Sequence, residues 1–205
     1  MALDIVILGP PGAGKGTQAK RVVAQTGIAH IGTGDMLRLA IDEGKPLGEE
    51  VKAVYDRGEL VSDDLMIRVM RARLLLEDTA SGALLDGFPR TLRQAEALGD
   101  LLEELDRELA LVIELELPEH AAVERLLARG EGRRDDRPDV IRRRFNVYRH
   151  ETEPVIGYYR DKGVLAAVDA EGTEEEVFAE VRKALDKTST HESERAVSAI
   201  SNGGL

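Results

Sequence analysis

The chain reads LDIVILGPPGAGKGT from Leu3 to Thr17. A short apolar strand therefore runs into a glycine-rich turn, and residues typical of a helix follow. Glycines let successive backbone N–H groups of such a turn point at an anion, and the first turn of the helix adds the positive end of its dipole. Lys15 supplies a full positive charge for the terminal phosphates of a nucleotide. These residues predict a phosphate-binding loop, in which Gly16 separates the lysine from the hydroxyl of Thr17.

Apolar runs that suit strands recur along the chain at residues 3–8, 28–31, 83–86, 109–115 and 164–168. They are rich in Val, Ile and Leu, which is typical of strands buried on both faces. Helical patterns separate them, at residues 16–25, 34–43, 47–57, 63–78, 91–105, 118–129, 138–162 and 173–185. Strands that alternate with helices favour an α/β fold with a parallel, doubly wound sheet.

Composition narrows the class of partner. The formal net charge of −11 gives a surface that repels nucleic acid and anionic membranes, so we expect neither as a partner. The absence of cysteine excludes disulfides and cysteine-bound zinc.

No signal-sequence pattern opens the chain and residues 3–8 are too few to span a bilayer, so a cytoplasmic protein is expected. The Ser/Thr/Gly-rich stretch 188–205 is expected to be a disordered tail.

A second motif, LLDGFPRT, runs from Leu84 to Thr91. Asp86 ends an apolar strand, which is the position from which a carboxylate holds Mg²⁺ beside the loop lysine. Gly87 allows close approach of the backbone, and Pro89 fixes the turn. Arg90 then projects into the crevice at the carboxyl end of the sheet, where open α/β sheets bind ligands.

Five arginines stand near the ends of expected elements. Arginine binds phosphate oxygens through a planar fork and keeps its charge at any ordinary pH. If these side chains converge on the phosphate-binding loop, they form a cationic cavity in an acidic protein. They are Arg38, Arg90, Arg129, Arg133 and Arg144.

Three motifs together resemble the adenylate kinase family: GPPGAGKGTQ at 9–18, TGDMLR at 33–38, and DGFPRT at 86–91 with Gln94 after it. The resemblance implies reversible transfer of a phosphoryl group from ATP to AMP, giving two ADP. It also implies a P-loop NTPase-type fold with five parallel strands, and a monomer. The expected core domain spans 1–187, with a mobile AMP-binding insert at about 32–61 and a short lid at about 129–137.

The same resemblance assigns roles to residues by motif match. Gln94 is expected to read the adenine edge of AMP, Arg38 to bind its phosphate, and Arg125 to stack on the base of ATP. The residues expected to act on the transferred group are Lys15, Arg90, Arg129, Arg133 and Arg144. Those expected at ATP are Gly12, Ala13, Gly14, Lys15, Gly16, Thr17, Arg125, Arg129 and Gly172. Those expected at AMP are Thr33, Arg38, Glu59, Leu60, Val61, Gly87, Phe88, Pro89, Arg90, Gln94, Arg133 and Arg144.

Two departures from the family pattern modify these expectations. Almost no chain separates Arg129 from Arg133, which is the short-lid form, so no zinc is expected. Mg²⁺ is expected to arrive with ATP and to lie near Thr17 and Asp86, without a site made by protein alone. Glu59 stands where some relatives carry lysine, but that contact is expected to be made mainly by the backbone.

Three alternatives compete with this interpretation. A UMP/CMP kinase of the same family is the nearest, although Thr33 and Gln94 favour AMP. A GTPase-like switch would need an Asn-Lys-x-Asp motif, which the sequence lacks. An inactive homologue is disfavoured because Lys15, Asp86 and all five arginines are present.

Overall fold

The computed structural model of the protein describes residues 2–128 and 137–202, with side chains up to residue 188. A five-stranded sheet lies at its centre, in the order β2-β3-β1-β4-β5, and every neighbouring pair is parallel. The strands are β1 (Asp4–Leu8), β2 (Ala29–Gly32), β3 (Ala83–Asp86), β4 (Leu109–Glu116) and β5 (Leu165–Asp169). The five expected strands are therefore confirmed, with bounds that differ by at most one residue.

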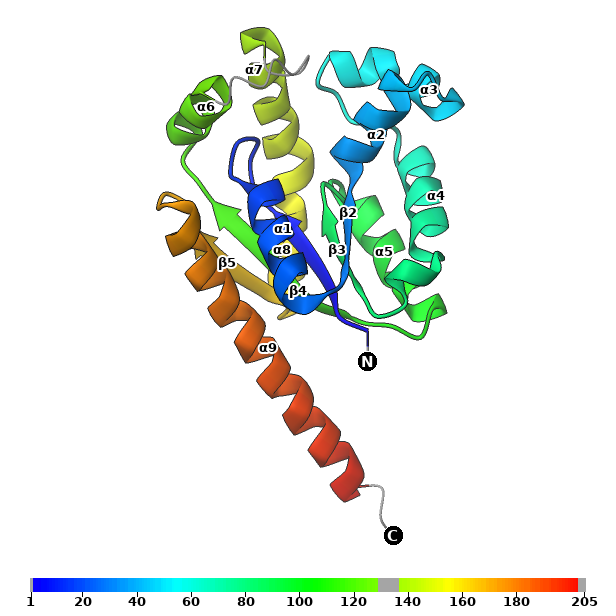
Figure 1. The fold of residues 1–205 in the computed structure, drawn as a ribbon, viewed down its shortest axis with the longest axis vertical. Helices are drawn as coiled ribbons and strands as arrows, with labels where there is room; N and C mark the ends of the chain where they lie inside the picture. Colours follow the sequence, from blue (N-terminus) through cyan, green and yellow to red (C-terminus); the bar gives the residue numbers. More distant parts are fainter. Residues whose placement is uncertain (1, 129–136, 203–205) are drawn as a thin grey trace.

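Helices connect the strands and cover both faces of the sheet (Figure 1). Within the described residues, none of them combines the length and the apolar character needed to cross a membrane. The helices are α1 (Lys15–Thr26), α2 (Thr33–Asp42), α3 (Pro46–Asp56), α4 (Asp63–Leu74), α5 (Leu92–Glu104), α6 (Glu119–Ala128), α7 (Pro138–Val147), α8 (Glu153–Asp161) and α9 (Glu174–Asn202), with the short 3₁₀ turn η1 (Glu77–Thr79) and the π turn η2 (Tyr148–Thr152).

Alternate residues of each strand enter two separate hydrophobic cores, because successive side chains of a strand point to opposite faces. Val6 and Leu85 pack in the core formed with α4, α5 and α8. Ile5 and Ile7 pack in the core formed with α1, α6, α7 and α9. All five residues of β1 are buried, as expected for the central strand of a sheet that is covered on both sides.

The strand order reverses at β1, since β3 and β2 lie on one side of it and β4 and β5 on the other. Open α/β sheets bind their ligands outside the carboxyl ends of the strands at such a point. In Figure 1, α6 and α7 stand above one side of this end of the sheet, and α2 and α3 stand above the other. The topology therefore places the loop that follows β1 at the expected position of a ligand.

Two expectations about helices differ from the structure. The pattern at 138–162 predicted one helix, but η2 divides it into α7 and α8. Pro154 has no N–H to continue the α-helical ladder, and Glu153 N–H instead donates to the Tyr148 carbonyl, five residues back. The pattern at 173–185 predicted a helix that ends earlier than α9, which runs to Asn202 (Figure 1), and the expectation of a disordered tail at 188–205 stays a prediction. A helix that is already nucleated extends at little cost through residues that tolerate helix.

The opposite edge of the sheet is tied together by a buried ion pair. Asp4 is fully buried, and its carboxylate accepts from Arg107 Nε at 2.8 Å and from the N–H of Ala83 at 3.0 Å. Arg107 leads into β4 and Ala83 begins β3, so this carboxylate links the starts of three neighbouring strands. The ion pair therefore aligns the strands at their amino ends, opposite the carboxyl ends where the loops lie.

Candidate functional site

Residues 9–17, here called the phosphate loop, turn from β1 into α1 as the sequence predicted. Gly12 and Gly14 have φ angles of +87° and +88°, a conformation that L side chains rarely adopt. At Gly12 an added Cβ would also lie 2.5 Å from the carbonyl oxygen of Ala122 in α6. Gly14 precedes α1 and makes no side-chain cap there, and the start of such a helix favours an anion through its dipole.

Lys15 and Asp86 bring opposite charges to this loop. The Lys15 ammonium donates to the carbonyls of Gly9 and Pro10 at 2.7 and 2.9 Å, so it lies against the loop. Asp86 ends β3, and its Oδ2 lies 3.5 Å from the position of a Cβ added at Gly16. The carboxylate is thus beside the first turn of α1, which also carries Thr17.

This donor set fits Mg²⁺ held together with a phosphate. A carboxylate and a hydroxyl are hard oxygen ligands, and Mg²⁺ in nucleotide sites takes one or two of them along with phosphate oxygens. Among the described residues, no group of three or more His, Cys, Asp or Glu side chains could hold a metal by itself. Asp86 and Thr17 are therefore suited to a metal that enters with its nucleotide.

A second cavity, here called the arginine pocket, opens between α2, the segment before α4, the β3–α5 loop and α7. Nine of the twelve residues expected at AMP line it. Phe88 does not, because its ring is 1% exposed and packs in the core with α4 and α5. Pro89 is buried and does not line the cavity, and Arg133 lies outside the described residues. The lining residues are Thr33, Gly34, Leu37, Arg38, Tyr55, Gly58, Glu59, Leu60, Val61, Met66, Gly87, Arg90, Gln94 and Arg144.

Three of the five expected arginines meet at this pocket, and each comes from a different element. Arg38 projects from α2 and donates to the Tyr55 hydroxyl at 2.7 Å. Arg90 follows β3 and donates from Nε to the Gly87 carbonyl at 2.8 Å. Arg144 reaches the pocket from α7. Arg129 and Arg133 lie outside the described residues. The three described arginines therefore converge on this pocket, whose lining holds no residue of the phosphate loop, and the expected convergence on that loop stays a prediction.

Local partners keep the Arg38 guanidinium strongly basic. Burial alone would lower its pKa, but the hydrogen bonds to Tyr55 and Asp35, together with the charge of Asp35, raise the pKa above its usual value. The ion pair with Asp35, three residues earlier on α2, also fixes the direction of the side chain. The pocket thus keeps a permanent positive charge at the start of α2.

Glu59 ties the wall of the pocket to α7. Arg57 donates to its carboxylate at 2.8 and 3.0 Å, and Arg143 of α7 donates at 2.6 Å. The hydrogen bonds from Arg57, reinforced by Arg143, lower the pKa of Glu59. The Glu59 side chain is occupied by these two arginines, so the expected backbone contact with a base is the one still open to this residue.

Sequence reasoning missed five residues of the lining, which are Gly34, Leu37, Tyr55, Gly58 and Met66. It also missed two residues that hold the wall from behind. Asp63 accepts from the Gln94 amide at 2.8 Å. Thr152 in η2 donates its hydroxyl to the Arg90 carbonyl at 3.0 Å. The Thr-x-x-Gln spacing of Thr91 and Gln94 resembles a capping box and could have signalled that the Gln94 side chain turns back on the loop. No local pattern signals Thr152.

On the other side of the phosphate loop, two separately predicted residues are in contact. Arg125 of α6 donates to the carbonyls of Glu171 and Gly172 at 3.1 and 3.2 Å. Arg125 and Gly172 were both expected at the base of ATP, and the hydrogen bond between them makes one continuous surface of the two residues. The hydrogen bonds of Arg125 thus join α6 to the turn before α9.

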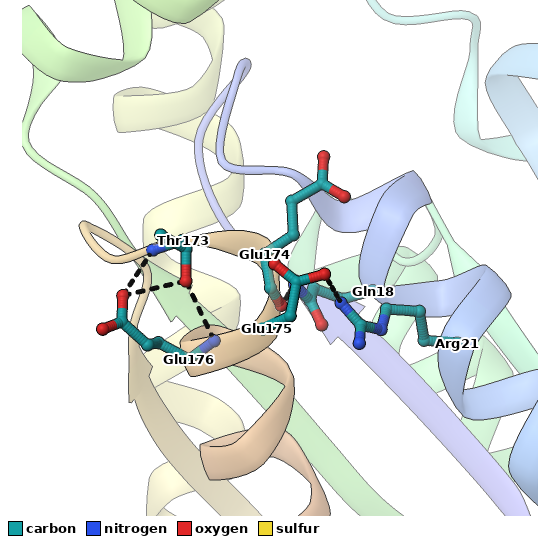
Figure 2. Close-up of polar contacts among 6 residues, drawn as sticks. All are labelled: Gln18, Arg21, Thr173, Glu174, Glu175 and Glu176. Carbon is teal, nitrogen blue, oxygen red and sulfur yellow. Dashed lines mark hydrogen bonds and ion pairs between the residues drawn. The ribbon is translucent and has the colours of Figure 1, made fainter.

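That turn is held in place by a cap and by α1 (Figure 2). Glu176 Oε2 accepts from the N–H of Thr173 at 2.8 Å, and Glu176 N–H donates to Thr173 Oγ1 at 3.3 Å, which together form a capping box. Gln18 of α1 donates to the Glu174 carbonyl at 3.1 Å, and Arg21 pairs with Glu175 at 3.4 Å. The start of α9 is therefore fixed to the helix that leaves the phosphate loop.

Known proteins resemble this chain over most of its length. The family model described as adenylate kinase matches residues 7–164. An adenylate kinase of Thermus thermophilus is 49% identical over 183 residues, covering 88% of this chain and 96% of that protein. Adenylate kinases of Synechococcus sp. (strain WH7803) and Xanthomonas euvesicatoria pv. vesicatoria are 49% and 46% identical, and each match covers 90% of this chain and all of the relative.

Proposed function

The chain belongs to the adenylate kinase family, and we propose that it catalyses reversible transfer of a phosphoryl group from ATP to AMP, which gives two ADP. The observation that carries this proposal is the junction of two anion sites. Thr33 and Gly87 line the arginine pocket, and Thr33 donates to the carbonyl of Asp86 at 3.3 Å. Asp86 in turn lies against the first turn of the phosphate loop helix. Two phosphorylated ligands can thus meet end to end.

ATP occupies the side of the phosphate loop. Its phosphates lie on the N–H groups of residues 12–17, with the Lys15 ammonium beside them. Its base stacks on Arg125 and lies against Gly172, two residues that a hydrogen bond joins into one surface. Arg129, outside the described residues, is proposed for the same phosphates on the motif match alone.

AMP occupies the arginine pocket. Arg38 binds its phosphate, because this guanidinium is charged and held in place by Tyr55 and Asp35. Leu60, Val61 and Met66 supply the apolar lining for the base. The part of the chain from β2 to the start of α4, residues 32–61, acts as a mobile AMP-binding insert, and residues 129–137 act as a short lid.

The reaction needs positioning and charge stabilisation more than proton transfer. The attacking oxygen of the AMP phosphate is already ionised at neutral pH, so no general base is required. Arg90 and Arg144 lie where they neutralise charge on the transferring group, and Lys15 does so from the ATP side. Mg²⁺ supplies further neutralisation of the ATP phosphates when it is bound, with Thr17 and Asp86 as the residues that would hold it. Closure of the insert and lid excludes water, which would otherwise accept the phosphoryl group.

We propose that the protein acts as a monomer in the cytoplasm, without a nucleic-acid or membrane partner. The acidic composition, with a formal net charge of −11, supports the absence of a nucleic-acid or anionic-membrane partner. Size-exclusion chromatography with light scattering tests the first of these statements. A dimer that persists at low protein concentration would contradict it.

The decisive assay pairs ATP and Mg²⁺ with AMP, UMP, CMP or GMP in parallel and quantifies the diphosphates formed. ADP from AMP should dominate by far. Preferred turnover of UMP or CMP would assign the chain to the pyrimidine branch instead. Lys15→Ala should abolish most of the activity, because the proposed role of the ammonium is to stabilise the transferring phosphates. The fall in kcat/KM should correspond to a loss of about 3 kcal/mol or more of transition-state stabilisation.

Arg38→Ala tests the assignment of the two pockets. We expect KM for AMP to rise at least about tenfold while KM for ATP stays within about twofold, because only one nucleotide loses a charged partner. Arg142→Ala is a suitable control, since Arg142 is an exposed arginine of α7 that does not line the pocket. A rise in KM for ATP in the Arg38 variant would reverse the assignment.

A further inference from the structure

The side-chain amide of Gln94 is held from two sides in the wall of the arginine pocket. Its Oε1 accepts from the backbone N–H of Arg90 at 2.8 Å, and its Nε2 donates to Asp63 Oδ1 at 2.8 Å. The residue is only 2% exposed. These two partners leave the amide a single orientation, because a backbone N–H only donates and a carboxylate oxygen only accepts.

Asp63 is itself fixed by the next helix. The hydroxyl of Thr91, which caps α5, donates to the same Oδ1 at 3.1 Å and accepts from the Gln94 N–H at 3.2 Å. The start of α4 and the start of α5 are thus joined through one carboxylate oxygen. A flip of the Gln94 amide would place its oxygen against Asp63 and its NH₂ against the Arg90 N–H, and both contacts would be repulsive.

The fixed orientation defines what the amide can offer a ligand. One lone pair of Oε1 and one hydrogen of Nε2 are used, which leaves one acceptor and one donor on neighbouring atoms. Adenine presents the complementary pair, since its 6-amino group donates and the adjacent ring nitrogen accepts. A 6-oxopurine places an acceptor where adenine has the donor, so its O6 would face Oε1 without a proton between them.

We propose that Asp63 is a specificity-determining positioning residue, which sets the Gln94 amide so that the arginine pocket selects 6-aminopurine over 6-oxopurine monophosphates. The inference rests on the proposed function, because it deepens the substrate choice of the same pocket. Asp63 acts through Gln94 and does not itself touch the nucleotide. Its acceptor atom carries this role, and its charge is not required.

Asp64 provides a matched control. It is the next residue on α4 and carries the same side chain, but it is exposed and pairs with the exposed Arg93. Asp63→Ala and Asp64→Ala therefore remove the same group from the same helical turn, and only the first removes a contact that fixes the Gln94 amide.

The experiment measures kcat and KM for AMP and for inosine monophosphate (IMP), with ATP and Mg²⁺ held constant. In Asp63→Ala we expect the AMP-to-IMP ratio of kcat/KM to fall about tenfold, mainly through a higher KM for AMP, because the amide loses one of the two contacts that fix its orientation and keeps only the one to the Arg90 N–H. KM for ATP and the ratio in Asp64→Ala should change by less than about twofold. An equal loss for both nucleotides in Asp63→Ala would overturn the proposal.

Asp63→Asn keeps an acceptor oxygen at this position and removes the negative charge. It also keeps the size of the side chain, so it provides a test if Asp63→Ala fails to fold. An asparagine carbonyl can accept from both Thr91 and Gln94, so this variant should keep an AMP-to-IMP ratio within about threefold of the parent. A ratio as low as that expected for Asp63→Ala would overturn the proposal. Failure of the parent protein to phosphorylate AMP would refute the proposed function, whereas an active parent that accepts IMP as well as AMP would refute only the role of Asp63.

Discussion

At the scale of single residues, Gly87 is the position where the arginine pocket tolerates least change. Its φ is +86°, and an added Cβ would lie 2.5 Å from Thr33 Oγ1 and 3.0 Å from Arg90 Nη2. We expect Gly87→Ala to lower kcat/KM for AMP at least about tenfold, because both neighbours must move. The free energy of unfolding should fall by about 1–2 kcal/mol from backbone strain. Steady-state kinetics and thermal unfolding measure the two effects.

Gly99→Ala is the control for that variant. Gly99 lies inside α5, and a Cβ added there meets no atom within 4 Å. Alanine should leave the kinetics unchanged and raise stability by about 0.5–1 kcal/mol, since it is the better helix former. Similar activity of the two alanine variants would show that the close packing at Gly87 has no part in the reaction.

The residues of the site could be predicted from sequence only where a motif carries them. Lys15, Arg90 and Gln94 stand at fixed spacings from glycines or a strand end, and those spacings indicate their roles in the sequence itself. Asp63 and Thr152 act through hydrogen bonds to partners 31 and 62 residues away in the chain. No local spacing encodes such a pair, because the fold alone brings the two ends together.

At the scale of elements, the π turn η2 links the helical layer to the site. The turn widens the helix between α7 and α8, and it places Thr152, which is 6% exposed, at the carbonyl of Arg90. π turns inside helices often occur at functional positions, since they redirect side chains that a regular helix would point elsewhere. The turn thus fixes the backbone of Arg90, the arginine proposed to neutralise charge on the transferring group.

Thr152→Val keeps the shape of the side chain and removes the hydroxyl. We expect kcat for ADP formation to fall several-fold, with the free energy of unfolding lower by about 1–3 kcal/mol, because the Arg90 carbonyl loses a buried partner. Thr26→Val is the comparison, since that hydroxyl donates only within α1, to the Val22 carbonyl at 2.9 Å. Unchanged kcat in a folded Thr152→Val protein would remove the link between η2 and Arg90.

The elements themselves were largely predictable, and the exceptions have physical causes. The strands followed from apolar runs, and the doubly wound sheet followed from their alternation with helices. The division of 138–162 was not predicted, because its apolar periodicity continues through Pro154 and masks the missing N–H. The length of α9 was not predicted either, because the apolar periodicity of its sequence ends near residue 185 while the helix continues to Asn202.

At the scale of the whole molecule, an acidic protein gathers a group of four cations at one end of the sheet. The formal net charge is −11, yet Lys15, Arg38, Arg90 and Arg144 gather around the carboxyl ends of the strands. One acidic residue, Glu114 on β4, is buried without a hydrogen bond to its Oε2 among the described residues. It is 8% exposed, and Arg160 lies 3.7 Å away. Burial above all, and then the charge of Glu116, raise the pKa of Glu114, while Arg160 opposes them.

This buried carboxyl makes the stability of the molecule depend on pH with a definite sign. Because the folded-state pKa of Glu114 lies above its unfolded value, the folded protein binds the proton more tightly, so stability falls as pH rises between the two values. Glutamine carries no titrating proton, so Glu114→Gln should not lose stability as pH rises. We expect its Tm at pH 7 to be about 2–4 °C above that of the parent. At pH 4, below the unfolded pKa, the difference between variant and parent should close. Glu103→Gln, an exposed change on α5, should shift neither value. Thermal unfolding at both pH values measures the effect, and a difference that stays equal or grows toward pH 4 would contradict the assignment of the pH dependence to Glu114.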